Sequence, residues 1–196
     1  MKFIYLKEID STQKYLIKLL KNELIKPPIC IWSENQTNGI GSKGNSWLNS
    51  KGNLFFSFCK KETIPIHTIS LYYAYKLKVV LEELGQEVLI KWPNDLYTKD
   101  LKKVGGVMSN LVGENIVVGI GLNSKKTPKK SFGCLDIEIK NDKIIEHFFK
   151  KVISFEKFIN GYKKEFLKTK DIFKIDGYLD DDGALIQNNK RIYSRR

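Results

Sequence analysis

Short apolar runs bounded by polar residues occur along most of the chain and predict β-strands. These runs cover residues 2–6, 29–32, 54–58, 88–91, 96–98, 103–111, 116–122 and 135–139. Apolar residues spaced three or four apart predict a first helix, a second over residues 69–84, and two more after residue 140. Runs of strands separated by a few helices favour an α+β fold with a mixed, largely antiparallel sheet and helices packed on it.

The ends of the first two helices are marked by residues that cap or break helices. Asp10-Ser11-Thr12 supplies N-cap chemistry for the first helix, whose apolar residues extend to Leu24 and which Pro27-Pro28 ends. Pro65 leads into the second helix, and Gly85 stops it. The sequence therefore predicts both helices from periodicity and from their ends.

The C-terminal segment predicts one β-hairpin, with an acidic turn at residues 180–183 between two short strands. An EF-hand alignment on Gly183 places Tyr178 at the first ligand position and Asn189 at the last, so a solvated turn fits better. A chain of 196 residues suits one domain with a small appendage. We therefore expect a main domain over residues 1–170 and a reduced C-terminal remnant over residues 171–196.

One stretch has neither strand nor helix periodicity, although two apolar strands flank it. Residues 36–47 contain three glycines in six positions, small polar residues, one lysine and a closing Trp47. Unstructured loops of this length inside compact domains are usually functional or disordered. Because glycines let a backbone approach a ligand and turn N–H groups toward an anion, we interpret the stretch as a loop that a ligand orders.

Charge and cysteine content restrict the classes of protein. The net charge is +12, which is compatible with nucleic acid or another acidic partner, but the lysines are dispersed along the chain as on a solvated surface. Three scattered cysteines indicate reduced thiols in a cytoplasmic protein. The sequence shows no signal peptide, no run long enough to span a bilayer and no spacing typical of a bound metal, so no membrane association is expected.

Three further motifs carry candidate chemistry. Lys91-Trp92-Pro93-Asn94-Asp95 presents a polar pair after a strand, although Asn-Asp also forms ordinary turns. Lys102-Lys103-Val104-Gly105-Gly106 places lysines before a double glycine, where a ligand could approach, although a surface pair beside a β-bulge is an alternative. Gly119-Ile120-Gly121-Leu122-Asn123 ends a strand; it lacks the third glycine of a dinucleotide fingerprint, and a packed strand is its alternative. His67 and His147 are isolated and are interpreted as structural.

Taken in order, these segments resemble the catalytic domain of biotin–protein ligases. The matching pieces lie between residues 10 and 123: Asp10–Gln13, Gln36–Trp47, Gly52–Leu54, Lys91–Leu96, Lys103–Met108 and Gly119–Asn123. The resemblance implies a sheet and helices of the class II aminoacyl-tRNA synthetase/biotin ligase type. It also implies a two-step reaction, in which biotin and Mg-ATP form biotinyl-5′-AMP and the acyl group passes to one lysine of a biotin carboxyl carrier protein.

The resemblance also implies site residues. Those for biotin are Ser11, Thr12, Gln36, Gly39, Trp47, Lys103, Gly105 and Gly106. Those for the nucleotide are Gly41, Ser42, Lys43, Asn45, Asn94, Asn123 and Phe132. Lys103 would stabilise charge on the carboxylate and α-phosphate, and Asp95 is the carboxylate expected near the metal or the acceptor lysine. Magnesium would enter with ATP, and no metal held by protein ligands alone is expected.

The chain departs from the family pattern in its glycine loop and at its ends. Family members usually carry several arginines in this loop, whereas here Ile40, Ser42 and Asn45 leave Lys43 as the loop's cation. Arginine's bidentate grip on phosphate is not replaced by serine or asparagine, so we expect the adenylate to be held less tightly. No helix-turn-helix precedes the catalytic segment, so repressor activity and specific DNA binding are not expected; a monomer and a homodimer are both compatible.

Two other functions compete with this one. A lipoate or octanoate ligase or transferase shares the fold class, and the Lys91–Asp95 run favours biotin over it. A basic nucleic-acid-binding module would require lysines and aromatic residues gathered on one surface. That second alternative leaves the Lys103-Val104-Gly105-Gly106 motif unexplained.

Overall fold

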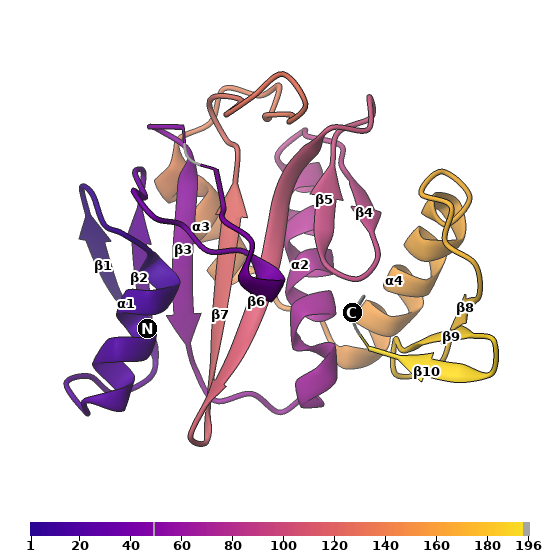
Figure 1. Ribbon diagram of the computed structural model, residues 1–196, viewed down its shortest axis with the longest axis horizontal. Helices are drawn as coiled ribbons and strands as arrows, with labels where there is room; N and C mark the ends of the chain where they lie inside the picture. The colour runs from indigo at the N-terminus through magenta and orange to yellow at the C-terminus, as the bar shows by residue number, and fades with distance from the viewer. Residues whose placement is uncertain (49, 194–196) are drawn as a thin grey trace. The chain divides into compact units, whose positions relative to one another are not determined.

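The computed structural model describes residues 1–48 and 50–193, and its ribbon is drawn in Figure 1. The chain folds into two compact units. The first comprises residues 1–63 and 104–135, and the second comprises residues 64–103 and 136–196. The predicted α+β class is confirmed, because helices accompany strands that pair mostly in antiparallel fashion. The predicted domain boundary at residue 170 stays a prediction.

Five strands build the sheet of the first unit, in the order β1-β2-β3-β7-β6. They are β1 (Lys2–Leu6), β2 (Ile29–Ser33), β3 (Leu54–Cys59), β6 (Lys103–Val112) and β7 (Asn115–Leu122). The first pair is parallel and the other pairs are antiparallel. All six residues of β3 are buried, which explains its continuous apolar run at the centre of this sheet.

Helix α1 (Thr12–Lys21) packs on this sheet, and Leu16 enters a core with Ile29, Ile31 and Val117. The expectation that the helical pattern extends to Leu24 is wrong. Glu23 adopts a left-handed conformation (φ 55°), and the Leu24 N–H bonds the Leu19 carbonyl, which closes the helix early. Leu24 is consequently 67% exposed and belongs to no apolar face.

The second unit contains three α-helices and a short hairpin. The helices are α2 (Ile69–Glu83), α3 (Asn141–Lys150) and α4 (Phe155–Thr169), and the hairpin joins β4 (Leu89–Lys91) to β5 (Asp95–Tyr97). A 3₁₀ turn, η2 (Ile66–Thr68), precedes α2. The core of this unit combines aliphatic residues with four large aromatic ones, Trp92, Phe158, Tyr162 and Phe166. None of the described helices is long and apolar enough to cross a membrane.

A three-stranded sheet, β10-β9-β8, forms from the C-terminal residues of the second unit. It comprises β8 (Tyr178–Leu179), β9 (Leu185–Gln187) and β10 (Lys190–Ile192). The predicted hairpin is present, but the third strand was missed. Asn188 and Asn189 both have positive φ (50° and 58°), the conformation of a type I′ turn, which asparagine tolerates.

The strand expected over residues 135–139 is also wrong, because no strand of the described chain lies there. Its backbone donors bond to separate partners instead of to one neighbouring strand. The Leu135 N–H donates to the Asn123 carbonyl, and the Asp136 N–H donates to Gln86 Oε1 at 2.6 Å. The alternating apolar pattern at residues 135–139 therefore does not correspond to a strand paired in a sheet.

The three cysteines form no disulfide bond with one another. Cys30 and Cys59 are buried in β2 and β3, and Cys134 is partly buried. Burial raises the pKa of the Cys30 thiol far above its ordinary value, and burial together with Glu62 raises the pKa of Cys59 to about 11. Both β-strand thiols are therefore protonated at neutral pH and poor nucleophiles.

Candidate active site

A neutral hydrogen-bonding cluster lies where α1 begins in the first unit. The Thr12 N–H and Thr12 Oγ1 both donate to Gln36 Oε1, at 2.8 and 3.0 Å. Thr12 Oγ1 also lies 2.9 Å from Ser57 Oγ of β3. All three side chains are at least 95% buried. A buried hydroxyl–amide group of this kind matches a ligand that is polar but uncharged.

The helix N-terminus itself is fixed by Ser11, which is 1% exposed and accepts a hydrogen bond from the Lys14 N–H at 3.4 Å. The neighbouring Gln13 donates through Nε2 to the Val117 carbonyl and to Asn110 Oδ1. Because the Val117 carbonyl can only accept, the Gln13 atom that faces it must be the amide nitrogen, which fixes the amide orientation. Gln13 Oε1 then points at Gly119, and it has no hydrogen-bond partner among the described residues.

The glycine loop is closed by backbone contacts of its own. The Trp47 N–H donates to the Gly39 carbonyl at 2.8 Å, and the Gly41 N–H donates to the Asn45 carbonyl at 2.6 Å. Between them lies a 3₁₀ turn, η1 (Ser42–Gly44). These contacts close the loop on itself, with Ser42 and Asn45 exposed. The side chain of Lys43, a predicted phosphate contact, lies outside what the structure describes.

Glycines in two strands leave room for the residues that cover them. A Cβ on Gly121 would lie 2.7 Å from Cε2 of Trp47, and a Cβ on Gly39 would lie 2.7 Å from Gln36 Nε2. In the ladder, Gly106 of β6 is the partner of Gly121 in β7. Because these paired glycines have no side chains, the Trp47 ring can pack directly against the backbone at Gly121.

Asn123 follows β7 and fastens the segment after it. Its Nδ2 donates to the Gly133 carbonyl at 3.0 Å, and its Oδ1 lies 3.3 Å from Nδ2 of the buried Asn53. Phe132, the residue expected to pack on adenine, is partly exposed in the same segment. Asn123 and Phe132 therefore belong to one tethered loop.

In the second unit, the two residues that the resemblance assigns to catalysis, Asp95 and Lys103, form an ion pair. Lys103 Nζ lies 2.7 Å from Asp95 Oδ1, with side chains 27% and 32% exposed. Trp92 beside them is buried, and its Nε1 lies 3.4 Å from the Gly183 carbonyl. The Tyr162 hydroxyl donates to the Pro93 carbonyl at 2.5 Å. Burial above all, with Glu165 and Asp95, raises the pKa of Tyr162 well above its ordinary value, so it remains a neutral donor.

The structure brings the predicted site residues into two groups. In the first unit Thr12, Gln36, Gly39 and Trp47 are linked by contacts, and in the second Asp95 and Lys103 pair while the partly exposed Asn94 precedes them. Sequence reasoning missed the cluster's third member and two buried amides: Ser57, Gln13 and Asn53. The signal for Ser57 was a hydroxyl inside an otherwise apolar strand. Gln13 and Asn53 lay inside matched motifs but received no role.

Comparison with known proteins assigns the family. The sequence model of the Biotin/lipoate A/B protein ligase family matches residues 5–123, more than half of the chain. The chain belongs to this family. The match covers the cluster, the glycine loop and the Asp95–Lys103 pair, so the ligase fold and these groups occur in the same segment.

Individual ligases resemble the chain over different lengths. A solved biotin acetyl coenzyme A carboxylase synthetase from Helicobacter pylori, with bound biotinylated ATP, is 35% identical with a TM-score of 0.88; the match covers 97% of this chain and 98% of that one. A biotin protein ligase from Aquifex aeolicus, in complex with biotin and ATP, is 26% identical (TM-score 0.73, 98% and 96% covered). The bifunctional ligase/repressor BirA of Escherichia coli strain K12 is 38% identical over 125 residues, which are 59% of this chain and only 38% of BirA.

Proposed function

We propose that this chain is an ATP-dependent ligase that activates biotin as biotinyl-5′-AMP and transfers it to a lysine of a biotin carboxyl carrier protein. The observation that carries the proposal is the buried Thr12–Gln36–Ser57 cluster. Its hydroxyl and amide groups suit the N–H and C=O groups of a ureido ring. The full-length similarity to a Helicobacter pylori synthetase with bound biotinylated ATP supports the same substrates.

The proposed reaction has two displacements. An oxygen of the biotin carboxylate attacks the α-phosphorus of ATP, and the bond to the bridging oxygen breaks as pyrophosphate leaves. The carrier lysine's amine then attacks the acyl carbon, loses a proton, and AMP leaves. Lys103 would stabilise negative charge on the carboxylate and α-phosphate in both steps. Asp95, 2.7 Å from the Lys103 ammonium, would hold it in position.

The remaining predicted residues take binding roles in this proposal. Biotin contacts are assigned to the cluster with Ser11, to Gly39 and Trp47 of the glycine loop, and to the Gly105–Gly106 backbone. Nucleotide contacts are assigned to Gly41, Ser42, Lys43, Asn45, Asn94, Asn123 and Phe132. Magnesium is proposed as part of the Mg-ATP substrate. The acceptor is proposed to be a biotin-dependent carboxylase subunit in the cytoplasm, and residues 171–196 are proposed as the remnant of a C-terminal domain.

The cluster also bears on the choice between biotin and lipoate, which the family description leaves open. A dithiolane ring carries neither N–H nor C=O groups, so it could not hydrogen-bond to the hydroxyl and amide groups around Thr12, which bond to one another in the structure. A site lined by such groups favours a ligand that can hydrogen-bond to them over one that cannot. Biotin is therefore the substrate that the cluster favours.

The test is incubation with labelled biotin, Mg-ATP and a carrier domain, with biotin-dependent pyrophosphate release measured in parallel. We expect label on the carrier lysine, and its absence together with absent pyrophosphate release would refute the ligase proposal.

Lys103→Ala should lower adenylate formation about 100-fold, as expected when a charge-stabilising group is removed. Lys102→Ala is the matched control, because Lys102 pairs with Asp100 in a half-exposed ion pair. Equal activity of both variants would exclude the role of Lys103.

A further inference from the structure

The segment after β7 is held at its start by a single buried side chain. Asn53 is fully buried, and its Oδ1 accepts the N–H groups of both Lys125 and Lys126 at 3.0 Å. Its Nδ2 donates to the Lys126 carbonyl at 2.9 Å. Because one amide satisfies three backbone groups, the beginning of the loop has a defined conformation.

The end of the same segment is held by a second buried asparagine. Asn123 Nδ2 donates to the Gly133 carbonyl, and the Asn123 carbonyl accepts the Leu135 N–H, each at 3.0 Å. The two asparagines also contact each other, at 3.3 Å. Figure 1 shows the loop emerging beyond the end of β7, with residues 125–132 between the two attachments. We refer to residues 125–132 as the lysine loop.

The lysine loop has an unusually one-sided charge. Lys125, Lys126, Lys129 and Lys130 are exposed within six positions, and residues 115–135 include no aspartate or glutamate. Within the described chain, Lys126, Lys129 and Lys130 form no ion pair with an acidic side chain. Gly52 approaches the start of this loop, since a Cβ on it would lie 3.9 Å from Lys125 Cβ. Like charges placed close together on a tethered backbone create a positive potential that attracts anions.

We propose that the lysine loop binds the β- and γ-phosphates of ATP and stabilises the pyrophosphate that leaves. This inference rests on the proposed function. The loop begins just after Asn123 and ends at Phe132, two of the residues assigned to the nucleotide. It carries four lysines, whereas the glycine loop contributes only Lys43. As the α-phosphorus accepts the carboxylate oxygen, the bridging electron pair passes to pyrophosphate. Lysines facing that group favour its departure by neutralising the charge that develops.

The test replaces Lys126, Lys129 and Lys130 together by methionine. The KM for ATP and the inhibition constant for pyrophosphate should each rise about tenfold, the combined effect expected for three exposed ion pairs. The KM for biotin and the transfer from added biotinyl-5′-AMP to the carrier should stay within about twofold, since neither involves the leaving phosphates. The equivalent triple arginine variant should restore ATP binding, because it restores the charge.

The control variant replaces Lys7, Lys18 and Lys21 by methionine, which removes the same net charge from positions in the first unit outside the lysine loop. It should leave the KM for ATP unchanged. An unchanged KM for ATP in the lysine-loop variant overturns the proposal, as does a rise confined to the KM for the carrier, which would make the loop a protein-docking surface. If the wild type releases no biotin-dependent pyrophosphate, the proposed function fails. Calorimetric binding of ATP alone to both variants still decides the lysine loop's role.

Discussion

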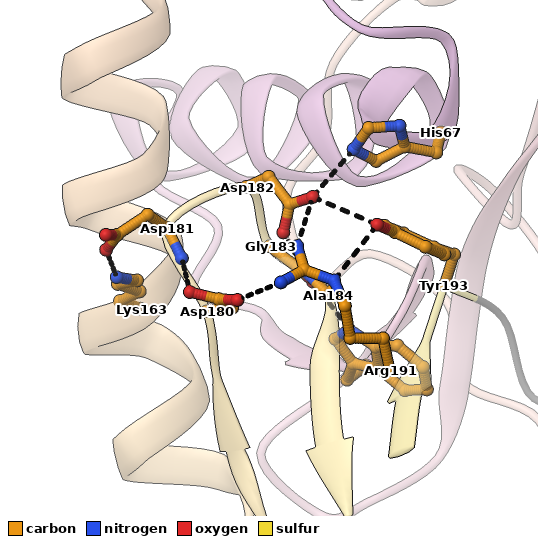
Figure 2. A network of polar contacts seen from close by, with 10 residues as sticks. His67, Lys163, Asp180, Asp181, Asp182, Gly183, Ala184, Arg191 and Tyr193 are labelled. Atoms are coloured by element: carbon orange, nitrogen blue, oxygen red, sulfur yellow. Dashed lines mark hydrogen bonds and ion pairs between the residues drawn. The ribbon is translucent and has the colours of Figure 1, made fainter. Parts of the chain in front are cut away.

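Two polar networks fasten loops in this protein, and they differ in burial and charge. In the first unit, the fully buried Asn53 and the 1% exposed Asn123 hold the lysine loop through neutral amide hydrogen bonds. In the second unit, the acidic turn at residues 180–183 is held by charged groups, as Figure 2 shows. There Asp182 Oδ2 accepts from Arg191 at 2.8 Å and from the Tyr193 hydroxyl at 3.2 Å, and lies 3.0 Å from His67 Nε2.

The difference in burial and charge determines which of the two networks the fold needs for its stability. Removing one partner of a buried neutral network leaves backbone N–H groups without water or protein acceptors, and that cost is large. Removing one partner of a solvated ionic network lets water and salt replace it, so the cost is small. The Arg191 side chain is 47% exposed, which places it in the second category. Truncation should therefore cost more stability in the buried network, and only the ionic network should respond to salt and pH.

The largest effect is expected for Asn53→Ala. The variant leaves the Lys125 and Lys126 N–H groups and the Lys126 carbonyl without their partner, and should lower the free energy of unfolding by about 3 kcal/mol. Urea unfolding measures this. Asn38→Ala is the matched control, because Asn38 is exposed in the glycine loop. A loss no larger than that of the control would contradict the structural role of the buried asparagine.

The sequence predicted such local features well where one physical signal dominates. The runs at 54–58 and 116–122 became adjacent strands, because burial on both faces favours mostly apolar residues without polar alternation. Asp95 and Lys103 were each predicted as site residues because both fell in motifs of the resemblance, but the ion pair between them was not predicted. Asn53 was not recognised as a structural centre, since nothing local shows that one amide will bond residues about 70 positions away.

The errors also have physical causes. The third C-terminal strand was missed because the Asn188-Asn189 turn lacks the glycine that usually marks a type I′ hairpin. The strand expected at 135–139 failed because its backbone donors are taken by Asn123 and Gln86, contacts that alternation along the chain does not encode. The missed strand thus follows a turn that lacks its usual glycine. The wrongly expected strand has tertiary hydrogen bonds that leave no signal in the local sequence.

A smaller effect is expected for Arg191→Met, which keeps much of the aliphatic stem and removes the contacts with Asp180 and Asp182. The melting temperature should fall only slightly at low salt. The difference from wild type should vanish near 1 M sodium chloride, where the screening length is about 3 Å. The Asn53→Ala deficit should persist there, because its hydrogen bonds are neutral and buried. A salt-resistant deficit in Arg191→Met would remove the distinction between the two networks.

The smallest expected effect is the pH dependence of stability that the Asp182 carboxyl contributes. Burial raises the pKa of this carboxyl, but the Ala184 N–H, Arg191 and Tyr193 together outweigh burial, so its folded-state pKa lies below the ordinary value. A depressed folded-state pKa stabilises the fold above the unfolded pKa, and this contribution is lost as pH falls through the folded value. Asp182→Asn should therefore cost stability near neutrality, and its difference from wild type should shrink below about pH 4. Unfolding titrations from about pH 7 to 2 measure the difference. The difference in unfolding free energy between Asn53→Ala and wild type should stay constant over that range, because none of the groups that this variant leaves unpaired titrates there. If both variants showed the same pH dependence, acid would act on the whole fold rather than on the charged turn.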